Sequence, residues 1–308
     1  MQEVKFIAVE SDEGLRLDKC IAVNHPEVSR SYVQKLIESG GAWINGNTGR
    51  CKDFVKVGDE IKVLIPEPKG LEVEAEDIPL DIVYEDDDVI LVNKPKGLVV
   101  HPAAGHYTGT LVNGLLYHCK GSLSGINGIL RPGIVHRIDK DTTGIIIACK
   151  NDTAHHSLAE QFKEHTITRR YNALVYGTFK ETEGRIESFI CRNPEERMKM
   201  MVSDSKGKHA ITNYTVLEQF GNKYSHIVCQ LETGRTHQIR VHMAHTGHPL
   251  LGDTIYGQKK DPFQLTGQTL HAGVLGFVHP STGEYMEFSS EVPAYFSDLI
   301  NKFRNQFS

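Results

Sequence analysis

The residues best suited to chemistry lie in the segment 133–144, which reads GIVHRIDKDTTG. Asp139 stands between Arg137 and Lys140, immediately before an apolar stretch typical of a buried strand. Neighbouring cations favour the ionised form of a carboxylate, and an ionised carboxylate suits a nucleophile better than a general acid. The pattern therefore favours Asp139 as a single functional acid.

Two other interpretations fit the same segment. Asp139 and Asp141 could form a paired-acid or divalent-metal site, but alternating positions of an extended segment point to opposite sides. The segment could also be a surface loop rich in salt bridges. The residues alone leave that alternative open.

The segment 168–177 offers contacts for RNA. Arg169 and Arg170 precede a strand-like run and are suited to contact phosphates. Tyr171 is either a platform on which a base can stack or an ordinary half-buried strand residue.

The segment 231–243 offers a partner for the acid. A loop at Gly234 leads into a predicted helix, on which Arg240 lies about one turn beyond Thr236 or His237. A guanidinium on a rigid element is suited to hold a carboxylate in fixed geometry.

Metal and thiol chemistry find less support. His242, His245 and His248 are spaced by three residues, so their directions drift by about 60° per step around a helix, and no His-Glu-x-x-His core is present. The six cysteines are scattered, form no Cys-x-x-Cys pair and avoid the segments above. We therefore expect no metal and no cysteine nucleophile.

The elements that must position these residues alternate irregularly along residues 89–308. Strand-like runs outnumber helical ones, which predicts an α+β domain around a mixed, largely antiparallel sheet. The predicted strands are 89–92, 144–148, 171–175 and 226–231, and the predicted helices are 153–162 and 236–245.

The N-terminal part reads as a separate small α/β module. Helical spacing appears over 15–21, Ser29 can cap a second helix through Ile37, Asn45-Gly46 predicts a tight hairpin turn, and 59–65 alternates as a strand. This pattern resembles the small S-four-type RNA-binding module of ribosomal proteins. A Pro-rich connector at 65–70 predicts the boundary, so we expect an RNA-binding domain over 1–70.

Charge is unevenly distributed along the 308 residues, whose formal net charge is −5. Residues 72–88 hold nine acids and no Lys or Arg, so we expect an acidic, solvated linker over 71–88. Residues 89–308 hold 24 Lys and Arg against 19 Asp and Glu, a balance compatible with RNA. No apolar run approaches the roughly 20 residues that span a bilayer, so we expect a cytoplasmic protein without a membrane partner.

Five stretches, in order along residues 89–290, resemble the RluA-type pseudouridine synthases that modify large-subunit ribosomal RNA. Ile138 stands where that family commonly has Leu, and Thr143 where Ser is commoner. The stretches are 93–102 (NKPKGLVVHP), 136–139 (HRID), 170–175 (RYNALV), 234–242 (GRTHQIRVH) and 247–253 (GHPLLGD) with Tyr256-Gly257.

The resemblance implies a catalytic domain over 89–308 that isomerises flipped-out uridines to pseudouridine without metal or cofactor. It implies that Asp139 is the catalytic aspartate, Tyr171 the active-site tyrosine and Arg240 the partner of Asp139. Arg137 is implied to displace or hold the flipped nucleotide. The candidate RNA-binding residues are Arg137, Arg169, Arg170, Arg235, Arg16, Arg30 and Lys35.

The implied partner is structured RNA, taken to be large-subunit ribosomal RNA or its precursor. The sequence does not indicate an oligomeric state, and we assume a monomer. Transfer RNA is the alternative substrate. A non-catalytic RNA-binding factor is the rival function, and it would not need Asp139, Tyr171 and Arg240 intact together.

Overall fold

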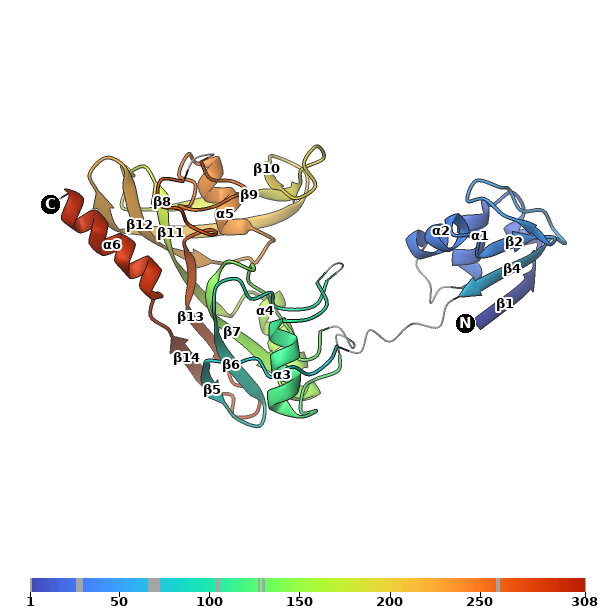
Figure 1. The fold of residues 1–308 in the computed structure, drawn as a ribbon, viewed down its shortest axis with the longest axis horizontal. Helices are drawn as coiled ribbons and strands as arrows, with labels where there is room; N and C mark the ends of the chain where they lie inside the picture. The colour runs from blue at the N-terminus through green and yellow to red at the C-terminus, as the bar shows by residue number, and fades with distance from the viewer. Residues whose placement is uncertain are drawn as a thin grey trace. The chain divides into compact units, whose positions relative to one another are not determined.

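The computed structural model describes residues 2–25, 30–65, 73–103, 106–126, 128, 131–258 and 261–307. The chain divides into two compact units, Met1–Leu71 and Glu72–Ser308 (Figure 1). The predicted Ser29 cap and the connector Pro66–Gly70 lie outside the described residues.

The first unit packs two helices on a four-stranded antiparallel sheet of order β1-β4-β2-β3. Asn45 and Gly46 both adopt positive φ, 49° and 78°, which confirms the tight turn expected between β2 and β3. The strand β1 was not predicted. The elements are β1 Gln2–Ile7, the short 3-10 helix Glu10–Asp12, α1 Leu17–Asn24, α2 Arg30–Glu38, β2 Ala42–Ile44, β3 Asn47–Thr48 and β4 Glu60–Ile65.

The second unit is built on one large sheet of order β10-β9-β11-β12-β8-β13-β7-β6-β5, with β14 paired to β13. Among its described strands the ladders are antiparallel except β7 with β13, as the mixed-sheet prediction required. The strands are β5 Ile82–Glu85, β6 Val89–Lys94, β7 Thr143–Cys149, β8 Thr168–Tyr176, β9 Glu183–Arg192, β10 Met200–Ser203, β11 Lys208–Phe220, β12 Tyr224–Leu231, β13 Leu270–Val278 and β14 Tyr285–Ser289.

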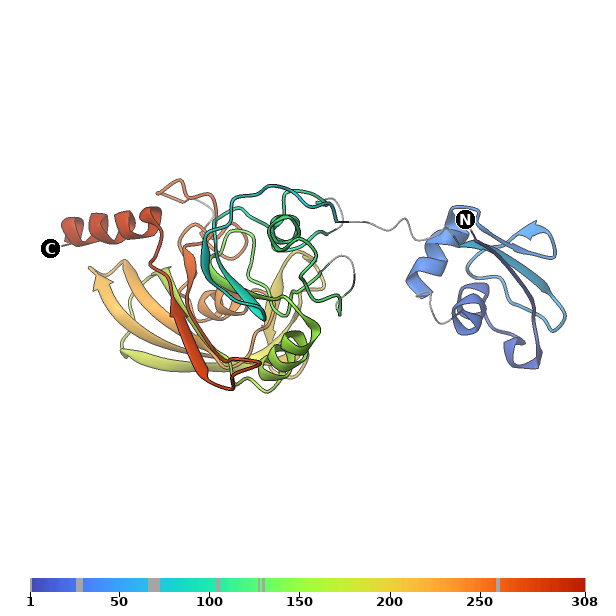
Figure 2. The same ribbon diagram turned by 90° about the horizontal axis from the view of Figure 1, so that it is seen from below.

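Four helices cover this sheet: α3 Leu111–Cys119, α4 Asp152–Lys163, α5 Gln238–His245 and α6 Ala294–Phe307. Along β7 alternate side chains enter two cores, one containing residues of α3 and the other residues of α4, so the strand is buried on both faces. The helix α6 runs beside β11 and β12 (Figures 1 and 2) and packs through Phe296 and Phe303. No helix in the described parts of the chain combines the length and apolarity needed to cross a membrane.

The parallel contact between β7 and β13 requires a glycine. Gly144 has a φ of +110°, and a Cβ there would lie 2.3 Å from the carbonyl oxygen of Ala272. Only two residue pairs join these strands. Gly144 thus lets β13 cross close to the end of the loop that carries Asp139.

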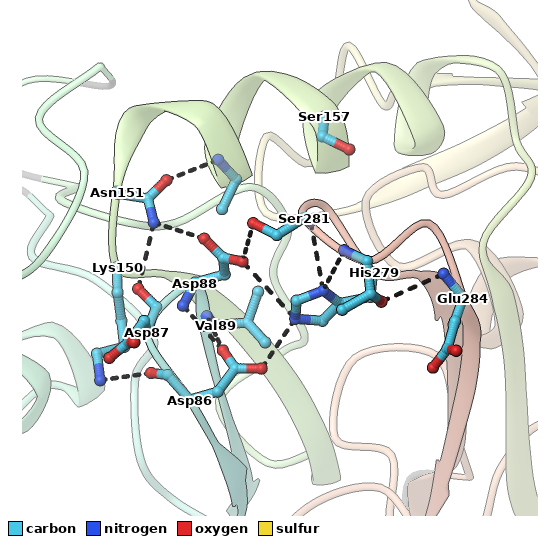
Figure 3. Close-up of polar contacts among 12 residues, drawn as sticks. Asp86, Asp87, Asp88, Val89, Lys150, Asn151, Ser157, His279, Ser281 and Glu284 are labelled. Carbon is cyan, nitrogen blue, oxygen red and sulfur yellow. Dashed lines mark hydrogen bonds and ion pairs between the residues drawn. The ribbon is translucent and has the colours of Figure 1, made fainter.

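The prediction of a solvated acidic linker over 71–88 is wrong for residues 73–88. Residues 82–85 form β5, which pairs with β6, and the acids after it are held by specific partners (Figure 3). Lys150 donates to Glu85 at 2.8 Å, and Asn151 donates to Asp88 at 2.8 Å. These partners lie over 60 residues away in the chain, so composition alone could not reveal them.

Candidate active site

A buried lysine fixes the loop that carries Asp139. Lys94 is fully buried, and its ammonium donates to the carbonyl oxygens of Pro95, Leu98 and Lys140, each at 2.9 Å. The backbone NH of Gly97 also donates to Lys140 O, at 3.0 Å. The turn 94–98 therefore sets the backbone position next to Asp139, which accords with a structural role for Lys94.

Asp139 and Asp141 diverge, as expected, although the reason differs from the one predicted. Residues 140–141 form a turn, closed by the NH of Thr142 donating to Asp139 O at 3.1 Å, and the segment is not a strand. Asp141 lies against Gly267, whereas Asp139 faces Arg240. The two acids form no pair.

Arg240 joins Asp139 to a second acid that the sequence did not single out. Its Nη1 donates to Asp139 Oδ2 at 2.8 Å, while Nε and Nη2 donate to Asp253 at 2.7 and 2.9 Å. The Asp253 side chain is fully buried, and its Oδ1 also accepts the NH groups of Ile255 and Tyr256 at 2.9 and 3.0 Å. The bidentate pair fixes the guanidinium so that its remaining edge meets Asp139.

The charges of this group stabilise one another. Burial alone lowers the pKa of Arg240, but the hydrogen bonds and charges of Asp253 and Asp139 outweigh it and raise that pKa above its usual range. Burial raises the pKa of Asp253, but the bonds and charge of Arg240 bring the net shift below the usual range. Arg240 and Asp253 are therefore both ionised at neutral pH.

Asp139, Tyr171 and Arg240 line one cavity of about 270 Å³, close to the roughly 300 Å³ at which small-molecule sites begin. Tyr171 on β8 is 7% exposed, and burial raises the pKa of its hydroxyl. Asp139 keeps a more open side chain, 27% exposed. The three predicted catalytic residues thus come together from a loop, a strand and a helix.

Strand alternation separates the two arginines before Tyr171. Arg169 lies on the Tyr171 face and lines the cavity, whereas Arg170 does not line it and pairs with Glu287. Arg169 passes close to Gly234, where a Cβ would lie 2.5 Å from Arg169 Nη1. The absence of a side chain at Gly234 makes room for the arginine. Arg170 therefore points away from the catalytic group, and its contact with RNA stays a prediction.

Two more predicted arginines line the cavity. Arg137 precedes Asp139 in the loop and is exposed, and Arg235 donates from Nε to His209 O at 2.8 Å. With Arg169 they give the cavity a cationic wall that suits phosphate.

His237 and Tyr256 also lie in the vicinity of Asp139, and neither was predicted as a site residue. The hydroxyl of Tyr256 bonds His237 Nδ1 at 2.8 Å, and the Arg240 guanidinium carbon lies 5.2 Å from the Tyr256 ring centroid. His237 Nε2 is 3.9 Å from Asp139 Oδ1. Both stand inside stretches quoted above, but no spacing rule distinguishes them there. The helix α5 begins at Gln238, two residues later than predicted.

In the first unit, two of the three predicted RNA contacts hold a buried acid. Arg16 and Arg30 bind Asp18 at 3.1 and 3.0 Å, and the Asp18 side chain is fully buried. Lys35 is exposed on α2. The structure thus gives Arg16 and Arg30 a structural role and leaves Lys35 facing solvent.

One group in the described part of the chain has atoms close enough to share a metal ion: Asp86, Asp88 and His279 (Figure 3). His279 Nδ1 accepts the NH groups of Ser281 and Thr282 at 3.3 and 3.2 Å, which places the ring proton on Nε2. That nitrogen lies 2.8 Å from Asp86 and donates to it. Because Nε2 carries a proton, it has no lone pair to offer a metal ion. Asp86, Asp88 and His279 therefore form a hydrogen-bonded contact between two turns and do not fit a metal site.

Two histidines of the series at 242–248 are likewise engaged inside the fold, whereas His245 is exposed. His242 contacts Ser188 and Thr212 at 3.0 and 2.9 Å, and His248 stacks on Phe179.

Known proteins are similar to this chain over most of its length. The family model described as RNA pseudouridylate synthase matches residues 88–245. The "Uncharacterized RNA pseudouridine synthase YlyB" of Bacillus subtilis is 49% identical over 304 residues, covering 99% of each chain. The "Ribosomal large subunit pseudouridine synthase D" of Zymomonas mobilis is 46% identical and covers 91% of each. The solved structure of "Human RNA Pseudouridylate Synthase Domain Containing 1" is 27% identical, with a TM-score of 0.56, over 77% of this chain and 97% of that one.

Proposed function

The chain belongs to the RNA pseudouridylate synthase family, and from that premise we propose that it converts uridines of large-subunit ribosomal RNA to pseudouridine with Asp139 as the catalytic carboxylate. Pseudouridine synthases are isomerases. The N1–C1′ bond of uridine breaks, the uracil turns, and C5 bonds to C1′, with no net redox change or hydrolysis.

The choice of ribosomal RNA is supported by the relatives. Three relatives named "Ribosomal large subunit pseudouridine synthase D", from Zymomonas mobilis, Neisseria meningitidis and Pasteurella multocida, are 46%, 43% and 41% identical to this chain. Each alignment covers at least 91% of this chain. Similarity that spans both units supports a shared class of substrate.

The Asp139–Arg240 contact is the single observation that carries the catalytic assignment. Its 2.8 Å bond comes from a guanidinium already fixed by Asp253, at the wall of a cavity that also holds Tyr171. Such a preorganised partner holds an ionised carboxylate at one orientation without further rearrangement. Asp139 acts from there on the ribose or the uracil, by attack at a carbon or by removing a proton.

The target base must leave its stack to reach Asp139, at a cost of a few kcal/mol. Arg137, Arg169 and Arg235 offset that cost by binding the backbone around the flipped nucleotide. Tyr171 stacks on the uracil in the cavity that it lines together with Asp139. The first unit supplies additional RNA contacts through exposed cations such as Lys35.

Pseudouridine mapping tests this proposal. Total RNA is mapped from cells that lack the gene, complemented with the wild type or with Asp139→Asn. We expect discrete sites in large-subunit RNA that return only with the wild type. Sites confined to transfer RNA would overturn the substrate class, and no change in any RNA would favour a non-catalytic RNA-binding factor.

A further inference from the structure

His237 has a backbone conformation that side chains rarely adopt. Its φ and ψ of 57° and 21° lie in the left-handed region, at the N-cap of α5, where its side chain makes no capping bond. This conformation costs a residue other than glycine roughly 1–2 kcal/mol. Strain of this kind collects at functional sites, and the imidazole lines the cavity beside Asp139.

A chain of hydrogen bonds fixes which ring nitrogen carries the proton. The backbone NH of Met200 donates to the Tyr256 hydroxyl oxygen at 2.7 Å. The hydroxyl hydrogen is then directed to His237 Nδ1, 2.8 Å away. Because Nδ1 accepts, the neutral imidazole carries its proton on Nε2.

The protonated nitrogen, Nε2, forms no hydrogen bond within the described residues. Nε2 lies 3.9 Å from Asp139 Oδ1, beyond the range of a good hydrogen bond. A group that enters between the carboxylate and the ring can therefore receive the Nε2–H. The His237 side chain is 18% exposed, so a substrate can reach it.

The surroundings keep the ring neutral. Burial lowers the pKa of His237; the charge of Asp139 and more weakly that of Asp253 oppose the shift, whereas Arg240 and Arg137 add to it. The net pKa lies below the usual value. A neutral imidazole can still donate a hydrogen bond, and it does so without releasing its proton to a developing anion.

We propose that His237 is a catalytic residue that donates a hydrogen bond from Nε2 to a carbonyl oxygen of the target uracil. The assignment rests on the proposed function. When the N1–C1′ bond breaks, its electron pair stays with the uracil, and the negative charge spreads from N1 to the adjacent carbonyl. A fixed donor at that oxygen stabilises the negative charge of the base as the N1–C1′ bond breaks.

Two matched variants test the role. His237→Gln keeps an NH donor at a similar reach, whereas His237→Phe keeps the ring shape and has no donor, and both carry the same left-handed backbone cost. Single-turnover pseudouridine formation is measured on total RNA from cells lacking the gene, together with RNA affinity and thermal stability. Loss of one such donor costs roughly 10²–10³-fold in rate.

We expect His237→Phe to show that loss and His237→Gln to recover at least ten-fold of it, with equal affinity and melting temperature. A Phe variant at the wild-type rate, or Gln and Phe variants equally slow, would overturn the role of His237 while leaving the proposed function intact. Wild-type protein that forms no pseudouridine on this RNA would overturn the proposed function, and this role with it.

Discussion

Arg240 donates two hydrogen bonds, from Nε and Nη2, to the fully buried carboxylate of Asp253, at 2.7 and 2.9 Å. The pair leaves Nη1 as the guanidinium nitrogen that meets Asp139. The orientation of the proposed catalytic acid therefore depends on a residue that makes no contact with the cavity.

Replacing Asp253 with Asn should destabilise the second unit. Removing one partner of a buried ion pair costs roughly 3–5 kcal/mol because the other charge stays buried without compensation. Urea unfolding measures the change. In the double variant Asp253→Asn, Arg240→Gln the losses should fall short of additive, since both changes break one interaction; additive losses would show that the residues are not coupled.

Lowering the pH should remove the contribution of Asp253 to the stability of the folded state. Its pKa is lowered in the folded state, so its contribution to stability is complete above the ordinary carboxyl pKa of about 4 and is lost as the pH falls through the lower folded value. The stability difference between the wild type and Asp253→Asn should shrink below about pH 4. Unfolding curves from pH 7 to pH 3 measure it, and a difference that grows in acid would contradict the assignment.

Lys94→Met should disturb the loop that carries Asp139. Lys94 donates to three carbonyl oxygens, of which Lys140 O keeps the NH of Gly97 as a donor. Each of the other two, left without a donor, costs roughly 1–3 kcal/mol. Lys140→Met is the matched control, because Lys140 is exposed and surface changes stay within about 0.5 kcal/mol. Equal unfolding free energies for the two variants would show that the buried ammonium does not stabilise the turn.

In the first unit, Lys35→Ala and Arg30→Ala should differ. Lys35→Ala should weaken RNA binding and lower the salt slope by about 1, with an unchanged melting temperature. Arg30→Ala should also lower the melting temperature, because Arg30 neutralises the buried Asp18. Binding titrations at several salt concentrations and thermal scans separate the two effects. A melting temperature that drops for Lys35→Ala alone would reverse these roles.

Local pattern predicted part of the fold. The strands β1, β5, β9, β10, β11, β13 and β14 were not predicted. The runs at 89–92, 144–148, 171–175 and 226–231 are all strands, since each is long and apolar enough to identify itself. The helices α3 and α6 were missed. Helix α6 buries one stripe, made by Phe296, Leu299, Ile300 and Phe303. This spacing is typical of an amphipathic helix, so the helix was predictable from the sequence although it was not predicted.

The site residues also fall into those that the sequence identified and those that only the structure shows. Asp139, Tyr171 and Arg240 were identified by resemblance, and the structure brings them to one cavity. The turn after Leu250 and Leu251 positions Asp253 and Tyr256. Because the two leucines are buried, Asp253 lies where Arg240 can bind it. That contact joins segments 13 residues apart through a loop, which periodicity cannot describe.

The variant Asp139→Asn tests whether Asp139 catalyses the isomerisation, because Asn keeps the shape of the side chain and removes its charge. Purified wild type and variant are incubated with total RNA from cells lacking the gene, and pseudouridine formation and RNA affinity are both measured. We expect the wild type to restore the missing sites, and we expect Asp139→Asn to bind the RNA with similar affinity but to form no product. Pseudouridine formation by Asp139→Asn near the wild-type rate would contradict this role of Asp139.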